Sequence, residues 1–133
     1  MNRISQVLDT ARTIAVVGLS GKRYRPSYGV AEYMKRSGYR IIPVNPHEAE
    51  VLGEKSYPDL DSVPDPVDIV DIFRRSEFVP AIVEAAIRKG AKAIWMQEGV
   101  VHEGAAARAE AAGLVVIMDS CILKDHRRLA HAS

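Results

Sequence analysis

The sequence contains very little cysteine, no long apolar run and almost no net charge. Its 133 residues include one cysteine, Cys121, so no disulfide can form within the chain and a reducing cytoplasm is the expected compartment. No stretch reaches the roughly 18 apolar residues of a membrane span, and the first residues lack the apolar run of a signal peptide. Eighteen basic residues against seventeen acidic ones give no overall field for nucleic acid. We therefore expect a cytoplasmic protein that binds neither membranes nor nucleic acid.

The length limits the number of domains. A chain of 133 residues with 47% apolar content has the size of one compact domain, which we expect to span residues 1–133. A kinase, an ATP-dependent ligase or a two-domain dehydrogenase would normally need a second domain. Those classes are therefore excluded for this chain alone.

Short β-branched runs alternate with helical patterns, which is typical of βαβ units around a parallel sheet. The pattern predicts strands at 13–17, 40–44, 67–73, 93–96 and 114–118. It predicts helices at 4–11, 30–36, 79–89, 103–112 and 122–129, and a long loop over 45–66 with a short strand near 51–52. The expected fold is α/β, a Rossmann-like three-layer sandwich with a five-stranded parallel sheet, most simply in the order 3-2-1-4-5.

The segment after the first expected strand has the composition of a phosphate-binding loop. Gly18 and Ser20 begin it, and Lys22, Arg23 and Arg25 place three cations within four residues. Glycine lets backbone amides approach an anion, and the N-terminus of the next helix adds partial positive charge. The alternative is a solvated basic turn, but a position after the first strand favours phosphate.

Two common nucleotide motifs are missing from this loop. A dinucleotide fingerprint needs glycine at position 20, where Ser20 stands, and a carboxylate at the end of the second strand, which runs into Val44, Asn45 and Pro46. A P-loop needs two more residues between Gly18 and Lys22, followed by Ser or Thr. Extra cations without a ribose carboxylate suit coenzyme A (CoA), which has a diphosphate and a separate 3′-phosphate.

Side chains after the later strands could complete a ligand site. Phe73 could stack on adenine, and Arg74 or Arg75 could reach a phosphate. Gln97 could hydrogen-bond an amide of the pantetheine arm. The alternatives are a core position for Phe73, a surface role for the arginines and a helix cap at Gln97.

Several segments together resemble the CoA-binding domain family, small Rossmann-like proteins similar to the N-terminal domain of the succinyl-CoA synthetase α subunit. The match runs from about residue 7 to 129, and the segments that carry it include Val16-Val17-Gly18-Leu19-Ser20, Arg25-Pro26-Ser27, Pro43-Val44-Asn45-Pro46, Phe73-Arg74-Arg75-Ser76, Trp95-Met96-Gln97 and Met118-Asp119. The segments 43–46 and 73–76 are the most specific of these. The resemblance implies CoA binding, with Gly18, Ser20 and the segment 22–25 around phosphate. It also implies that Asn45, Pro46, Phe73, Arg74 and Gln97 lie at the site, and Pro26 belongs to a matching segment.

Other reactive residues do not form a catalytic pattern. Cys121 and His126 are five residues apart, a spacing that does not face them on one helix, and no third triad member is evident. We expect a structural cysteine, or at most thiol exchange with CoA. The four histidines lack metal-ligand spacing. Trp95 and Met96 fit the core.

We therefore expect a small module that binds CoA or an acyl-CoA without catalysis of its own. The alternatives are a small NAD(P)-dependent or acyl-CoA-transforming enzyme, disfavoured by the missing fingerprint, and a regulatory subunit that senses CoA. A homodimer or a partner acyl-CoA enzyme would fit a single small domain.

Overall fold

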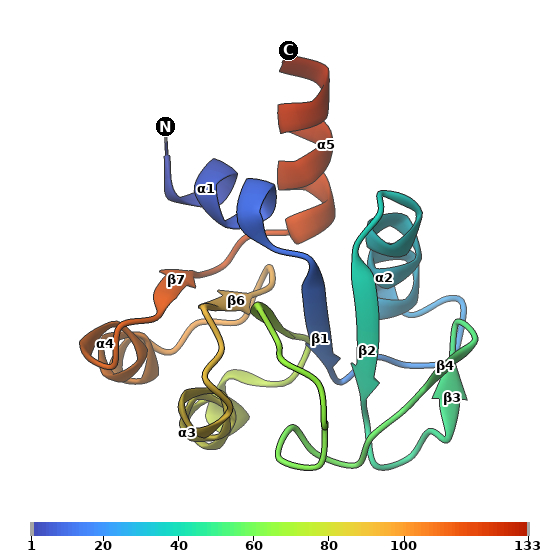
Figure 1. Ribbon diagram of the computed structural model, residues 1–133, viewed down its shortest axis with the longest axis horizontal. Helices are drawn as coiled ribbons and strands as arrows, with labels where there is room; N and C mark the ends of the chain where they lie inside the picture. The colour runs from blue at the N-terminus through green and yellow to red at the C-terminus, as the bar shows by residue number, and fades with distance from the viewer. Residues whose placement is uncertain (1, 133) are drawn as a thin grey trace.

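The computed structural model describes residues 2–132, which form a five-stranded parallel sheet with helices on both faces (Figure 1). The strands of this sheet are β1 (Thr13–Val17), β2 (Arg40–Val44), β5 (Ile69–Ile72), β6 (Ala93–Met96) and β7 (Val115–Ile117). The helices are α1 (Arg3–Thr10), α2 (Pro26–Arg36), α3 (Val79–Lys89), α4 (Glu103–Ala111) and α5 (Ile122–Ala132), with a 3-10 turn, η1 (Ser76–Phe78), before α3. A small antiparallel hairpin, β3 (Glu50–Val51) and β4 (Glu54–Lys55), follows β2.

Alternating side chains of the strands supply two cores. Ala15 and Val17 of β1 belong to the core under α3 and α4, whereas Ile14 and Val16 belong to the core under α1, α2 and α5. Figure 1 draws α3 and α4 below the sheet and α1 and α5 above it. This arrangement confirms the Rossmann-like α/β class, because a strand buried on both faces needs helices on both sides.

The predicted strand order 3-2-1-4-5 is wrong. The observed order is β2-β1-β5-β6-β7, so the strand over Ile69–Ile72 lies beside β1 and not beyond β2. Asp68 explains part of this placement, because its carboxylate accepts hydrogen bonds from the amides of Arg12 and Thr13 at 2.9 and 3.0 Å. The β5 strand is thereby anchored to the start of β1.

The chain between β2 and β5 crosses β1 without a helix. Leu60, Val63 and Val67 from this segment are buried in the core under α3 and α4, where a crossover helix would normally pack. β2 is left as an edge strand, which suits Pro43 because proline cannot donate to a ladder. The order therefore reverses between β1 and β5, and this switch point is where ligands bind in open α/β sheets.

The predicted helices all form, with small changes at their ends. The largest change is in α2, which begins at Pro26 and not at residue 30, since proline is well suited to the first helical turn. Gly90 adopts the left-handed conformation that ends α3, and glycine is the residue that takes this conformation without strain. Across residues 2–132, none of the helices has both the length and the apolar character needed to cross a membrane.

Candidate functional site

Two adjoining pockets lie at the carboxyl ends of the strands, on either side of the switch point. The first, which we call the loop pocket, has a volume of about 370 Å³ and is lined by Gly18, Ser20, Lys22, Arg25, Pro26, Ser27, Asn45, His47, Glu48 and Phe73. The second, which we call the strand-end pocket, has about 440 Å³ and is lined by Pro26, Val30, Phe73, Arg74, Arg75, Gln97, Glu98, Gly99, Val100 and Cys121. Pro26 and Phe73 line both, so the two pockets meet there.

Most of the residues predicted from sequence come together at these two pockets. Ten of the twelve line one or both of them. Pro46 lines a different pocket, below the sheet, together with Arg74. Arg23 is exposed on the loop and lines none of these pockets.

Gly18 lets the loop after β1 pass close to the end of β5. It has φ of +91°, and a Cβ placed there would lie 2.6 Å from the carbonyl oxygen of Phe73. The amide of Phe73 also donates to the carbonyl of Val17 at 2.9 Å. Only glycine fits this crossing, because any other side chain would meet backbone and not a movable group.

The loop holds its own shape through three consecutive amides. The amide of Ser20 donates to Ser27 Oγ at 3.0 Å, and the amide of Lys22 donates to Ser20 Oγ at 3.1 Å. Between them, the amide of Gly21 donates to a carboxylate oxygen of Glu48 at 2.7 Å. The loop is therefore preformed, but these three amides already have acceptors.

The cations of the loop are exposed. Lys22, Arg23 and Arg25 take part in none of the ion pairs recorded across residues 2–132. The Arg25 guanidinium lies 5.6 Å from the ring centre of Tyr24, which is 75% exposed. An aromatic ring so exposed beside cations can stack on a planar ligand.

Asn45 ties the segment after β2 to the loop after β1. Its side-chain amide donates to the carbonyl of Leu19 at 3.0 Å, while its side-chain oxygen accepts from the amide of His47 at 2.9 Å. Asn45 therefore has a structural role in positioning the loop pocket, in addition to lining it.

A buried polar pair lies next to the strand-end pocket. Asp71 of β5 is 1% exposed, and it accepts a hydrogen bond from the side-chain amide of Gln97 at 2.6 Å. Burial raises the pKa of Asp71 to about 7, against the opposing effect of the Gln97 hydrogen bond. Because the Gln97 nitrogen is turned to Asp71, its oxygen is left to accept a hydrogen bond from a ligand.

Two arginines follow β5 at the rim of the strand-end pocket. Arg74 stacks 4.3 Å above the ring centre of Phe78, which is 41% exposed. Arg75 is largely exposed and forms only a long ion pair of 3.8 Å with Glu77. Both guanidinium groups can therefore turn toward a ligand phosphate.

Sequence reasoning missed several lining residues. Glu48 has no local signal in the sequence, because it follows the end of β2 by four residues, beyond the position where a ribose carboxylate is expected. The signal for Ser27 is Pro26, because a proline suits the first turn of a helix and places Ser27 at the N-terminus of α2. Cys121 was expected to be structural, or at most to exchange its thiol with CoA, and the structure places it in the lining of the strand-end pocket.

His126 and Trp95 are held by contacts away from the two pockets. His126 is half-buried where α2 and α5 meet; it contacts Tyr33 through a 2.9 Å hydrogen bond and packs edge-on against Tyr33 and Tyr39. Trp95 is fully buried, as predicted, and its indole nitrogen donates to the carbonyl of Ser120. Residues 2–132 contain no group of three or more His, Cys, Asp or Glu that could hold a metal ion.

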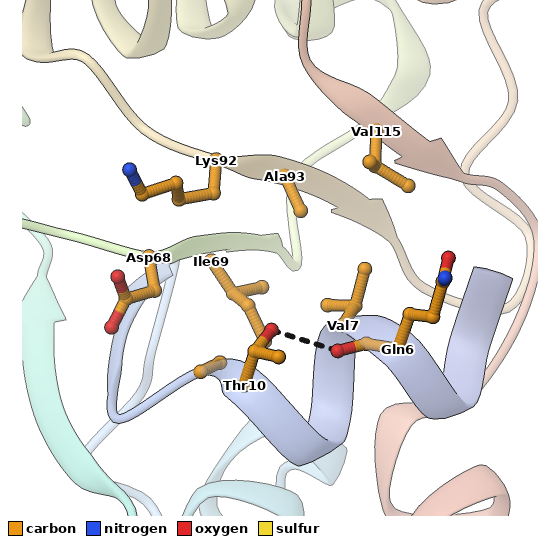
Figure 2. Close-up of a pocket in the computed structure, with 9 residues that line it drawn as sticks. Gln6, Val7, Thr10, Asp68, Ile69, Lys92, Ala93 and Val115 are labelled. Atoms are coloured by element: carbon orange, nitrogen blue, oxygen red, sulfur yellow. Dashed lines mark hydrogen bonds between the residues drawn. The ribbon is translucent and has the colours of Figure 1, made fainter.

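A third pocket lies at the opposite end of the sheet (Figure 2). It has a volume of about 420 Å³, and its walls are mainly apolar side chains of α1 and of the strand beginnings. Figure 2 shows its polar residues at the edges, with the Thr10 hydroxyl bonded to the carbonyl of Gln6. It lacks the glycine loop and the cation cluster, so the carboxyl-end pockets remain the candidate site.

The chain has relatives of similar length and also much longer ones. A family model described as CoA binding domain matches residues 12–127. The uncharacterized protein YneT of Bacillus subtilis is 42% identical over 129 residues, which is 97% of this chain and 92% of YneT. The ADP-forming acetate–CoA ligase II of Archaeoglobus fulgidus is 31% identical over 96 residues, covering 70% of this chain but 14% of the ligase.

Solved structures agree with these sequence matches. A hypothetical protein from Pyrococcus horikoshii OT3 superimposes with a TM-score of 0.93 at 38% identity, over 96% of this chain and 89% of that one. A Thermus thermophilus protein superimposes with a TM-score of 0.92 at 32% identity, over 97% and 99% of the two chains. This chain therefore belongs to the CoA binding domain family.

Proposed function

We propose that this chain binds coenzyme A or an acyl-CoA and does not catalyse a reaction alone. The observation that carries the proposal is the junction of a cationic pocket with a largely apolar one at the crevice between the loops after β1 and β5. CoA has a matching two-part chemistry, with phosphates on its nucleotide and a long, uncharged pantetheine arm. The family to which the chain belongs supports the same ligand.

The phosphates are assigned to the loop pocket. Lys22 and Arg25 line it, and Arg23 lies beside them on the same loop. Charge-assisted hydrogen bonds from such groups to phosphate are about twice as strong as neutral ones. The N-terminus of α2, whose first residues also line the pocket, adds partial positive charge.

The pantetheine arm is assigned to the strand-end pocket. Val30, Phe73 and Val100 offer apolar contact along it, and the oxygen of Gln97 can accept from an arm amide. The hydrogen bond that Gln97 donates to Asp71 holds its side chain in that orientation. The thiol or acyl end would then approach Cys121, which also lines this pocket.

Besides Tyr24 of the loop, two other aromatic rings near the pockets could stack on adenine. Phe73 lies at the junction of the pockets but is half-buried against the core, so no more than one face is open to a ligand. Phe78 is more exposed and carries Arg74 over its ring. We assign Phe73 to the boundary between the phosphate groups and the pantetheine arm of the ligand. Adenine would then stack on an exposed face of one of these aromatic rings.

The ligase relative supports a further part of the proposal. The match covers 14% of that ligase, so this chain corresponds to one part of an acetate–CoA ligase, and an acyl-CoA enzyme is the partner that we propose for the bound ligand. The chain would then serve as a carrier or sensor of CoA, as a monomer or a homodimer.

Amide NMR spectra during a CoA titration test the site directly. The amides of Gly18 and Gly99, which line the two pockets, should shift, and so should that of Gly21, which contacts Glu48 of the loop pocket. Gly90 and Gly113 serve as controls, since they precede strands β6 and β7 at the opposite edge of the sheet. Shifts confined to the control glycines, or no shifts at millimolar CoA, would contradict the proposed function.

A further inference from the structure

Glu48 places a negative charge inside the cationic loop pocket. One of its carboxylate oxygens accepts the hydrogen bond from the Gly21 amide at 2.7 Å. A Cβ at Gly21 would lie 3.0 Å from both oxygens, so the carboxylate lies directly against the loop backbone. This group occupies the surface of the loop that a phosphate would approach.

The hydrogen bond of the Gly21 amide differs from those of the Ser20 and Lys22 amides on either side of it. The amides of Ser20 and Lys22 bond to hydroxyl oxygens of Ser27 and Ser20, which are neutral and close in sequence. The Gly21 amide instead bonds to a charged group from a segment 27 residues away. A carboxylate on a backbone amide of a glycine loop imitates the anion that such loops bind.

No cation holds Glu48 in this place. Across residues 2–132 it takes part in none of the recorded ion pairs, although Lys22 and Arg25 line the same pocket. The backbone positions it instead, because its amide donates to the carbonyl of Asn45, and the Asn45 side chain is itself bonded to Leu19.

We propose that Glu48 is an internal anion that occupies the phosphate-binding loop and weakens the binding of phosphate-bearing ligands until it is displaced. A ligand phosphate must either replace the carboxylate on the Gly21 amide or bind beside it against charge repulsion. In both cases the wild-type protein binds phosphate more weakly than the same loop cations would bind it without the charge of Glu48. This inference rests on the proposed function, in that the loop pocket is taken as the phosphate site.

The test uses Glu48→Gln, which keeps an acceptor oxygen for Gly21 and removes the charge, and Glu48→Ala, which removes both. The control is Glu50→Gln, the same change of charge on an exposed residue two positions along that does not line the pocket. Binding of CoA and of inorganic pyrophosphate is measured by calorimetry on each folded variant. Both Glu48 variants should bind about 3- to 10-fold tighter than wild type, and the control should match wild type.

The two ligands separate failure of this inference from failure of the proposed function. CoA binding that is unchanged or weaker in both Glu48 variants overturns the inference but leaves the proposed function standing, because the protein still binds CoA. Weaker binding would instead assign Glu48 as an acceptor for ribose hydroxyls. Tighter pyrophosphate binding without any CoA binding would uphold the inference and overturn the proposed function. Loss of pyrophosphate affinity in both variants overturns the inference whatever CoA does.

Discussion

Replacing Asp71 with asparagine should change how the stability of this protein depends on pH. Asp71 lies in β5 between β1 and β6 and is 1% exposed, and its one side-chain hydrogen bond comes from Gln97. Burial disfavours the ionised carboxylate and raises its pKa to about 7. The asparagine side chain of the Asp71→Asn variant would have a similar shape and could still accept from Gln97, but it could not ionise.

The size of the effect follows from the two states of the carboxyl group. In the unfolded chain Asp71 has a pKa of about 3.9, so between pH 4 and 7 the unfolded state has lost a proton that the folded state retains. The folded state therefore loses stability as pH rises, by up to about 1.4 kcal/mol per unit. Between pH 5 and 7 the wild type should lose about 2 kcal/mol relative to Asp71→Asn, with little further change above pH 8.

Urea unfolding at pH 5, 6, 7 and 8 measures this difference. The free energy of unfolding of Asp71→Asn minus that of wild type should rise toward pH 7 and then level off. Asp9→Asn, which removes an exposed carboxylate on α1, is the control and should show no such rise. A difference between Asp71→Asn and wild type that stays constant from pH 5 to 8 would refute the reasoning, because it would mean that Asp71 ionises equally in both states.

Three further predictions concern the loop and the chemistry. Gly18→Ala should lower the free energy of unfolding by about 2 to 4 kcal/mol, through positive φ and overlap with a backbone carbonyl. Gly38 also has a positive φ but has open space around it, so Gly38→Ala should lower the free energy of unfolding only through backbone strain, by about 1 to 2 kcal/mol. Equal losses for the two variants in urea titrations would show that overlap with the carbonyl at Gly18 contributes nothing. Lys22→Ala and Arg25→Ala should each weaken CoA binding in calorimetry by about 1 to 3 kcal/mol, whereas Lys92→Ala, at the opposite pocket, should not. Purified protein should leave acetyl-CoA and succinyl-CoA intact in a thiol-release assay, and steady hydrolysis would support the enzyme alternative.

Local patterns in the sequence predict the elements and the site better than they predict the sheet. The strands and helices follow from short β-branched runs that alternate with helical patterns, and both signals act within a few residues. The strand order depends on contacts between distant segments, such as Asp68 with the amides of Arg12 and Thr13. The predicted order 3-2-1-4-5 was taken as the simplest Rossmann-like arrangement, whereas these long-range hydrogen bonds hold β5 beside β1.

The site residues also divide into those that local patterns predict and those that depend on contacts between distant segments. Ten of the twelve predicted residues line the two carboxyl-end pockets, because every loop after a parallel strand reaches that edge. Glu48 could not be assigned there, since only the turn held by Asn45 brings it back to Gly21. The hydrogen bond that allows Asp71 to be buried could not be predicted either. The alternation of side chains along a strand does not show that Gln97, which follows another strand, would reach Asp71.

Calorimetric titration of the wild-type protein with CoA, dephospho-CoA and NAD tests the central claim most directly. Each ligand has a diphosphate and an adenosine, but only CoA combines the pantetheine arm with a 3′-phosphate. The cationic loop and the adjoining apolar pocket predict that CoA binds tightest, that dephospho-CoA binds more weakly and that NAD binds weakest. NAD binding tighter than CoA would contradict the account, and equal affinity for CoA and dephospho-CoA would show that the loop cations do not read the extra phosphate.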